Sequence, residues 1–247
     1  GRLLSMPGFE GVQGFPSPAD DLTPVPAARW GGFLFASPDP AARFAEVMAP
    51  IEDTMGFAPW EDFTFDAEDS RDYALDAHWA LYLENYLEGF HVPFVHPGLN
   101  RVLDTAAYTT RTYAHASIQV GIVGPEQPAF DLPPDHPDAG LRVGAYYATI
   151  VPGTLINLYP WGASINLIQP TGPATTRVRY LTWVWRPELR GRGAGADPHQ
   201  VEAEDQVVVR SVQRGIRSRF ARPARFAPEH EVGVHHLHRL MERYLRG

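Results

Sequence analysis

The amino-acid sequence predicts an α+β fold, in which an antiparallel sheet packs against a long C-terminal helix and is preceded by an extended N-terminal arm. Short β-prone runs separated by Gly and Pro fill the middle third of the chain, and a helix-start signal stands at Asp197-Pro198. Pro and Gly are also frequent in the first 57 residues. Short strands joined by turns are typical of antiparallel sheets, because hairpins can connect consecutive strands.

The N-terminal arm contains two regular patterns. One is a strand-like run from Arg29 to Phe35, and the other is a short amphipathic helical pattern from Ala41 to Met48. The many prolines and glycines around them favour extended chain and turns for the rest of the arm.

A strong helical pattern extends from Ala77 to His91, with Glu88 and His91 beside its apolar stripe. Pro93 is expected to end this helix near residues 91–92, because proline lacks the N–H that continues a helix. His96 then lies on the following turn, from which it can approach the end of the helix.

The middle of the chain predicts a sheet of about five or six antiparallel strands. The β-prone runs are Tyr108–Tyr113, Ser117–Val123, Ala145–Val151, Leu155–Tyr159, Ser164–Gln169 and Arg177–Trp185.

The last long helix is expected to begin with Asp197 as its N-cap and to extend to about Phe220. Its expected buried face consists of Val201, Val208, Val212 and Ile216, and Asp205 completes that face. An unpaired buried carboxylate costs several kcal/mol, so Asp205 needs a cation, a proton or hydrogen bonds.

Composition excludes several classes of function. The chain has no Cys, which excludes disulfides, thiol catalysis and any iron–sulfur cluster held by these residues. All 21 basic residues are Arg, which excludes Schiff-base chemistry. The net charge of -8 argues against a nucleic-acid partner, and no apolar run or signal peptide indicates a membrane. We therefore expect a cytoplasmic protein.

Two histidines and one carboxylate are the candidate metal ligands. His91, His96 and Asp205 would form a 2-His-1-carboxylate set, which leaves coordination positions free and favours Fe(II) that activates oxygen. Two histidines at this spacing are, by themselves, more often satisfied by hydrogen bonds. The combination with Glu88 and with an acid on a second helix favours the metal.

Three stretches resemble one known family. Glu84-Asn85-Tyr86, Glu88, Phe90-His91 and His96-Pro97 together resemble the iron-binding motif of Rieske non-haem iron oxygenases, the alpha subunits of aromatic-ring hydroxylating enzymes. Glu204-Asp205 with Val212-Gln213-Arg214-Gly215-Ile216 resembles the helix that carries their carboxylate ligand. Gly1-Arg2-Leu3 and the run Trp30–Phe35 resemble the tail of a Rieske domain and its exit strand.

This resemblance implies roles for five residues. His91, His96 and Asp205 would bind mononuclear Fe(II), and Glu88 would link this site to the cluster of a neighbouring subunit. Asn85 would support the ligands. Many relatives have Asp at the linking position, so Glu88 points to the quaternary-amine monooxygenases.

The resemblance also implies an organisation and an activity. Residues 1–57 would be the tail of a Rieske domain plus a linker, and residues 58–247 a catalytic iron domain with the helix-grip (Bet v 1/START-like) fold. The reaction would be monooxygenation or dioxygenation of a small aromatic or quaternary-amine-like substrate with O2. Electrons would come from NAD(P)H through a reductase or ferredoxin and a two-iron two-sulfur Rieske cluster, in a homotrimer. We expect the missing cluster ligands in an upstream part of a longer parent protein.

Two other classes of protein stay open. A non-catalytic helix-grip ligand-binding protein would use the same sheet and pocket without iron. A zinc hydrolase would use the same three ligands with a metal-bound water. The identity of the metal separates the three interpretations.

Overall fold

The computed structural model describes residues 1–246 of the chain. The chain divides into two compact units, Gly1–Glu46 and Val47–Gly247, and each is described by itself. The interpretation of residues 1–57 as the tail of a Rieske domain plus a linker stays a prediction.

The first unit is mostly irregular chain with one 3-10 turn, η1 (Pro18–Asp20), and one hairpin. In the hairpin, β1 (Ala27–Trp30) pairs antiparallel with β2 (Phe33–Ala36). The expectation of one continuous strand over residues 29–35 is therefore wrong. Gly31 has a φ of 52°, a conformation that glycine adopts readily, and the chain reverses there.

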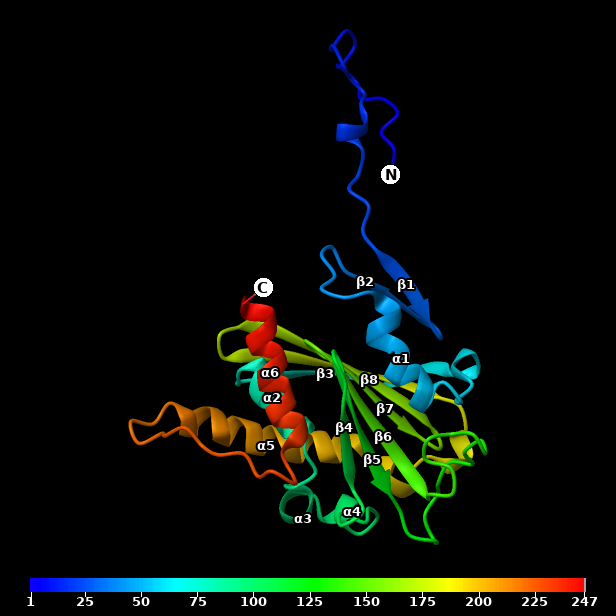
Figure 1. Cartoon of the computed structure of the whole chain (residues 1–247), viewed down its shortest axis with the longest axis vertical. Coiled ribbons are helices and arrows are strands. Elements are labelled where there is room, and N and C mark those ends of the chain that lie inside the picture. Colours follow the sequence, from blue (N-terminus) through cyan, green and yellow to red (C-terminus); the bar gives the residue numbers. More distant parts are fainter. Residues whose placement is uncertain (247) are drawn as a thin grey trace. The chain divides into compact units, whose positions relative to one another are not determined.

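The second unit is built on a seven-stranded antiparallel sheet, which confirms the predicted α+β class (Figure 1). Along the sheet the strands follow the order β3-β9-β8-β7-β6-β5-β4. Their bounds are β3 (Thr64–Leu75), β4 (Thr109–Thr112), β5 (Ala116–Ile122), β6 (Val143–Ile150), β7 (Thr154–Tyr159), β8 (Gly162–Gly172) and β9 (Thr175–Val184).

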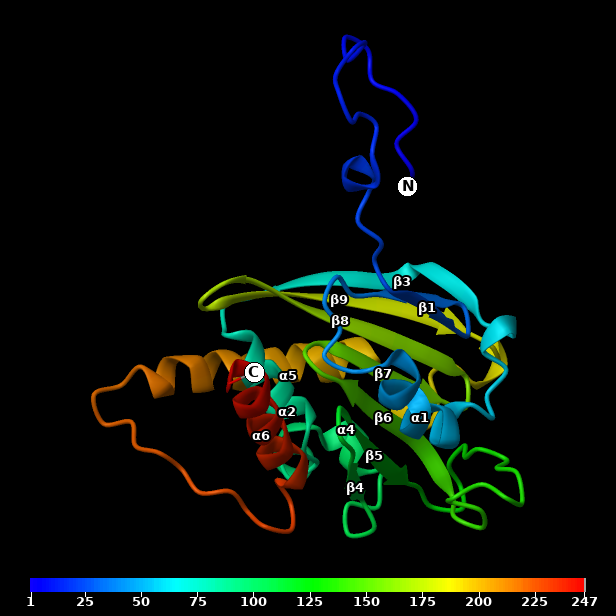
Figure 2. The same cartoon turned by 45° about the horizontal axis from the view of Figure 1, so that its top comes forward.

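Helices α2, α5 and α6 pack together on one face of this sheet (Figure 2). The helices are α1 (Phe44–Met55), α2 (Trp79–Tyr86), α3 (Val92–Val95), α4 (Pro97–Asn100), α5 (Pro198–Ile216) and α6 (Val232–Arg246), with 3-10 turns η2 (Trp60–Asp62), η3 (Pro187–Leu189) and η4 (Gly193–Gly195). Within residues 1–246, no helix combines the length and the apolar character needed to cross a membrane.

The core between the helices and the sheet is apolar. It includes Leu83 of α2, Leu155 of β7, Val178 of β9, Val209 of α5 and Leu237 of α6. Gly233 lets α6 approach α2 closely, because a Cβ there would collide with the backbone carbonyl of Leu87. The core thus fixes α2 and α5, the two helices that carry candidate site residues.

The sheet has one strand more than the sequence indicated. The missed strand, β3, is an edge strand that pairs only with β9, and its register shifts between Asp66 and Arg71. Most of its side chains are polar and at least partly exposed, so it lacks the apolar alternation that identified the others.

The helix expected over residues 77–91 is shorter than predicted. α2 ends at Tyr86, and Pro93 lies inside the short helix α3 instead of terminating α2. The chain turns at Gly89, where a Cβ would press against the ring of Tyr108. Glu88 stabilises this turn by accepting the backbone N–H groups of Phe90 and His91.

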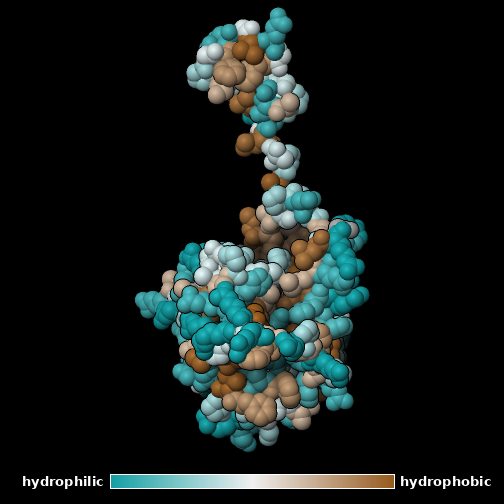
Figure 3. All heavy atoms as spheres, turned by 90° about the vertical axis from the view of Figure 1, so that its left-hand side faces the viewer, coloured by the Kyte–Doolittle hydropathy of each residue, from teal (hydrophilic) through white to brown (hydrophobic). Residues whose placement is uncertain are grey.

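The predicted start of α5 is confirmed, since the Asp197 carboxylate accepts the N–H of Gln200 at 2.9 Å. The predicted buried face is only partly right, since Val201, Asp205 and Val208 are partly buried. The buried side chains of α5 are Glu202, Gln206, Val209 and Gln213, whereas Val212 and Ile216 are 42% and 51% exposed. The helix also ends at Ile216 instead of near Phe220. Figure 3 faces the side at which α5 ends, and separate hydrophobic patches lie there on a mainly hydrophilic surface.

Leu237 provides a test of this packing. It is 1% exposed in the core, so Leu237→Ala should lower the free energy of unfolding by about 2–5 kcal/mol. Leu245→Ala, in the same helix but at an 84% exposed position, should change it by less than about 0.5 kcal/mol. Urea denaturation of both variants measures the difference, and equal losses would contradict the packing.

Candidate metal centre

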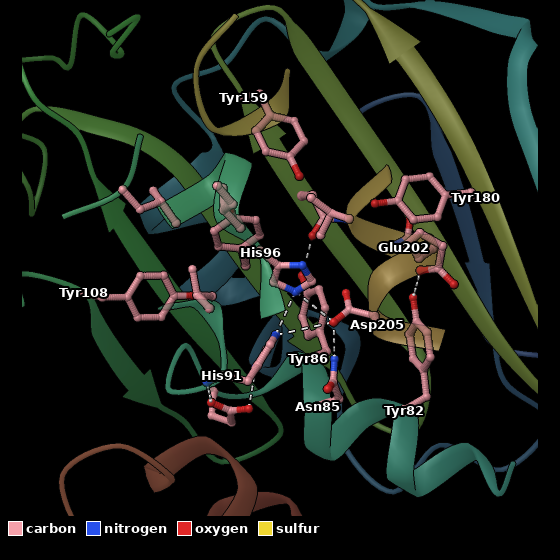
Figure 4. Close-up of a pocket in the computed structure, with 18 residues that line it drawn as sticks. Tyr82, Asn85, Tyr86, His91, His96, Tyr108, Tyr159, Tyr180, Glu202 and Asp205 are labelled. Atoms are coloured by element: carbon pink, nitrogen blue, oxygen red, sulfur yellow. Dashed lines mark hydrogen bonds and ion pairs between the residues drawn. The ribbon is translucent and has the colours of Figure 1, made fainter. Parts of the chain in front are cut away.

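A cavity of about 80 Å³ lies between the sheet and helices α2 and α5. Its wall is formed by side chains of α2, of the turn after α2, of strands β6 to β9 and of α5 (Figure 4). His91, His96 and Asp205 line it, as do Asn85 and Glu88, so the structure brings all five candidate site residues together.

The turn after α2 places the two histidines. His91 precedes α3 and His96 follows it, so this one short helix separates them. The backbone N–H of His96 donates to the carbonyl of Val92 at 3.0 Å, which closes the last turn of α3 and directs the ring back toward His91. The sequence predicts that a break at Pro93 brings His96 back toward the preceding helix. In the structure the short helix α3 brings His96 back.

Three potential ligand atoms converge from this turn and from α5. Nε2 of His91 lies 3.0 Å from Nε2 of His96, and Nε2 of His96 lies 3.0 Å from Oδ1 of Asp205. Nε2 of His91 lies 3.4 Å from the same oxygen. The His96 side chain is 1% exposed, whereas those of His91 and Asp205 are 17% and 16% exposed, so the group is closed on one side and open on the other.

Two other carboxylates hold the far sides of the rings. Nδ1–H of His91 donates to Oε1 of Glu88 at 2.5 Å, and Nδ1–H of His96 donates to Oε2 of Glu204 at 2.7 Å. A neutral imidazole has only one N–H, so these bonds leave both Nε2 atoms as lone-pair acceptors. Three acceptor atoms therefore face one another, an arrangement that requires positive charge between them.

The protonation of the imidazoles reflects the same requirement. Burial lowers the pKa of His91, but hydrogen bonds and charge interactions with Asp205 and Glu88 outweigh burial and raise it to about 9. The pKa of His96 is also raised, since Asp205 and Glu204 outweigh burial there. Burial raises the pKa of Asp205, but its hydrogen bonds to both histidines produce a net lowering. Without a metal, the site therefore attracts protons.

The three atoms fit a metal ion as a common ligand set. An ion about 2.1 Å from two ligand atoms at right angles separates these atoms by about 3.0 Å. The separations of 3.0, 3.0 and 3.4 Å agree with three ligands on one side of one ion. The carboxylates behind the imidazoles are the partners that orient histidine ligands in metal sites.

Asn85 acts on the carboxylate. Its Nδ2–H donates to Oδ1 of Asp205 at 2.6 Å and so connects α2 to α5. This bond fixes the orientation of Asp205 without adding charge. Asn85 lies one turn before Glu88 along the chain, and both residues belong to the motif that the sequence singled out.

Three further features of the site were missed from the sequence. Glu204 holds His96, and an acid directly before a candidate ligand was the only sequence signal for it. Glu202 is 2% exposed and lines the cavity, and no pattern in the sequence indicated a second buried acid on α5. Asn166 also lines the cavity, and its Oδ1 is buried and accepts no hydrogen bond from residues 1–246.

The remaining wall is rich in tyrosine. Six tyrosines line the cavity: Tyr82, Tyr86, Tyr108, Tyr147, Tyr159 and Tyr180. Burial raises the pKa of each phenol well above its ordinary value, so all are neutral at physiological pH. Neutral tyrosine rings offer electron-rich faces to a cation.

Comparisons with known proteins identify the family of the chain. The family described as ring hydroxylating alpha subunit (catalytic domain) matches residues 61–247. Choline monooxygenase of Arabidopsis thaliana is 29% identical over 100% of this chain and 60% of its own length. The carnitine monooxygenase oxygenase subunit of Escherichia coli (strain K12) is 25% identical over 98% of this chain and 67% of its own length. The chain thus spans about three fifths of the Arabidopsis relative.

Solved structures show the same fold. A quaternary ammonium Rieske monooxygenase in complex with L-carnitine has a TM-score of 0.69 at 19% identity, covering 99% of this chain and 67% of its own. Naphthalene 1,2-dioxygenase from Rhodococcus sp. has a TM-score of 0.67 at 15% identity, covering 99% of this chain and 71% of its own. The resemblance stated from the sequence is confirmed, and the chain belongs to the family of ring-hydroxylating alpha-subunit catalytic domains.

Proposed function

We propose that His91, His96 and Asp205 bind one Fe(II), and that the chain is the oxygen-activating part of a monooxygenase for a small quaternary ammonium compound. One observation carries the proposal: three acceptor atoms converge within 4.8 Å beside a cavity lined by tyrosines. Two imidazoles and one carboxylate with open positions are the ligand set of non-haem Fe(II) oxygenases.

The bound iron would supply the redox chemistry that places one atom of O2 in a C–H bond and releases the other as water, using two electrons from NAD(P)H. The residues of this chain would hold the ion and exclude water. Glu88 and Glu204 keep the Nδ1 protons of the two ligand histidines, and Asn85 fixes Asp205. The ligands therefore need little reorganisation when the ion binds.

We further propose that Glu88 connects the site to its electron source. Its side chain is 12% exposed and already accepts from the His91 ring and from two backbone N–H groups, and its carboxylate can accept one more hydrogen bond from outside the cavity. The donor would be a two-iron two-sulfur Rieske cluster of a neighbouring subunit in a homotrimer, reduced by a reductase or ferredoxin. Residues 1–57 would be the tail of the Rieske domain plus the linker.

The cavity supports a quaternary ammonium substrate. Tyrosine rings that turn their faces toward an alkylammonium group bind it through cation–π attraction. The cavity of about 80 Å³ is small, which favours a compact substrate over a polycyclic aromatic one. The choline and carnitine monooxygenases among the relatives act on compounds of this class by their names.

Family membership favours an oxygenase over the two other classes considered from the sequence. A ligand-binding protein of this fold would need no metal. A zinc hydrolase would bind zinc preferentially and would depend on neither oxygen nor reductant.

Anaerobic loading with Fe(II) tests the site. The wild-type chain should bind about one equivalent of iron and give the electron paramagnetic resonance signal of a ferrous nitric oxide adduct. His91→Ala and Asp205→Ala should each lower the affinity at least about 100-fold, because each removes one of three ligands. His238→Ala is the matched control, since His238 pairs with Glu84 outside the cavity. An unchanged affinity for Fe(II) in both ligand variants, or a preference of the wild type for zinc over iron, would refute the proposal.

Glu204 gives a second test of the ligand geometry. Glu204→Ala removes the partner of His96 Nδ1 and should weaken Fe(II) affinity about 10- to 100-fold. Glu204→Gln keeps an acceptor oxygen and should recover most of that loss. Titration with Fe(II) measures both variants, and equal affinities for Glu204→Ala and the wild type would show that His96 needs no such partner.

A further inference from the structure

We infer that Glu202 is the counter-charge of the substrate cation, and that it makes this pocket select substrates with a net positive charge over zwitterions and neutral isosteres. The inference rests on the proposed function and narrows its substrate class to amines without a carboxylate.

Glu202 lies in the pocket wall one helical turn before Asp205. It is 2% exposed, and Figure 4 shows it beside Tyr180 and Tyr82, on the opposite side of Asp205 from His91. The Tyr82 hydroxyl donates to Oε2, and Gln206 donates to Oε1 at 2.9 Å. Both partners are neutral, so the charge of the carboxylate has no ion-pair partner in the pocket wall.

The charge balance of the site leaves room for a cation even with iron present. Glu88, Glu204 and Asp205 contact the two imidazoles and contribute three negative charges, of which a divalent ion compensates two. Ionised Glu202 raises the remaining charge to two negatives. A substrate with one positive charge reduces this imbalance, and a neutral substrate does not.

The lining of the pocket offers no cationic side chain to a substrate carboxylate, although its tyrosine hydroxyls and asparagine amides can donate hydrogen bonds. No Arg lines the cavity within residues 1–246, and the chain contains no Lys. The guanidinium of Arg210 donates to Gln206 and to the carbonyl of Ala74, and it lies outside the lining. A betaine would therefore bring its carboxylate into a negatively charged site without a cationic partner, which is unfavourable.

The pKa of Glu202 is consistent with a carboxyl group that becomes fully ionised when a cation binds beside it. Burial raises its pKa to about 7, although Tyr82 and Gln206 hydrogen-bond to the charged form. Asp205 raises this pKa further and Arg210 lowers it. The other titratable groups near Glu202 are Tyr180 on β9 and Tyr73 on β3, both neutral phenols with raised pKa values.

A purely structural role does not require the charge. A glutamine at this position keeps a carbonyl oxygen that can accept the Tyr82 hydroxyl, gives up only the acceptor of the Gln206 amide, and removes the desolvation of a carboxylate. An acid in such a place points to a ligand that uses the charge.

Calorimetric titration of the iron-loaded protein under anaerobic conditions tests the inference. Choline should bind at least about tenfold more tightly than its neutral carbon isostere 3,3-dimethylbutan-1-ol, and also more tightly than the zwitterion L-carnitine. Glu202→Gln should lower choline affinity about tenfold and change the affinity for the neutral isostere by less than about threefold. Glu188→Gln, an exposed glutamate on η3, is the matched control and should leave both affinities unchanged.

The outcomes separate the inference from the proposed function. Equal binding of choline and the neutral isostere by the wild type, or an unchanged preference in Glu202→Gln, overturns the role of Glu202 while iron binding stands. A chain that binds no iron overturns the proposed function, and the same titrations on the metal-free chain still measure the preference. If Glu202→Gln lowered the affinities for choline and for the neutral isostere equally, the role of Glu202 would be merely structural.

Thermal unfolding gives an independent readout. Because the pKa of Glu202 in the folded chain lies above its ordinary value, the folded chain retains a proton that the unfolded chain loses below pH 7. The wild type therefore loses stability as the pH rises to about 7, and Glu202→Gln avoids this loss. The variant should melt several degrees above the wild type at pH 8 and at the same temperature at pH 4. A lower melting temperature at pH 8 would contradict a buried charge at this position.

Discussion

The structure around the site depends on one constraint: three acceptor atoms must be held close together although they repel one another. Nε2 of His91, Nε2 of His96 and Oδ1 of Asp205 lie 3.0 to 3.4 Å apart. Such an arrangement is stable only if the surrounding chain fixes each group and a cation relieves the repulsion. The sheet and its helices supply the first condition, because α2 and α5 share one apolar core that the second unit buries against strands β7 to β9.

This constraint explains the unusual inner face of α5. A helix on a sheet normally turns its apolar stripe inward, but α5 buries Glu202, Gln206 and Gln213. Each has a partner: Tyr82 for Glu202, Glu202 for Gln206, and the backbone N–H of His78 for Gln213 at 2.7 Å. The bonds of Gln213 and Glu202 connect α5 to the start and middle of α2, and the Gln206 bond fixes Glu202 within α5. Directional contacts on this polar face thus hold α5 in register with the helix that leads to the two histidines.

The sequence predicted the architecture and the candidate ligands. It did not predict which polar side chains are buried. Strands β4 to β9 alternate or are continuously apolar, so their periodicity identified them, and the Asp197-Pro198 signal located the start of α5. The same reasoning assigned Val212 and Ile216 to the core, because hydropathy cannot tell an exposed valine from a buried one when the true inner face is glutamate and glutamine. β3 escaped detection because an edge strand with charged side chains lacks the expected alternation. Glu202 and Glu204 could not be assigned roles, since their partners Tyr82 and His96 lie more than a hundred residues away in the chain.

The acidic residues on the inner face of α5 differ in their surroundings and therefore in their ionisation. The acids Glu202, Glu204 and Asp205 point in different directions around the helix, so each meets a different environment. Glu202 contacts Tyr82, Glu204 contacts the ring of His96, and Asp205 contacts both histidines. Burial raises the pKa of the Glu202 carboxyl. Hydrogen bonds from Gln200 and His96 outweigh burial and lower the pKa of Glu204, and hydrogen bonds to both histidines lower the pKa of Asp205. One helical turn therefore provides an anion for a metal, an anion for an imidazole and a carboxyl group that is half ionised near neutral pH. Only the last can change its charge when a cation enters, because the other two already have positive partners.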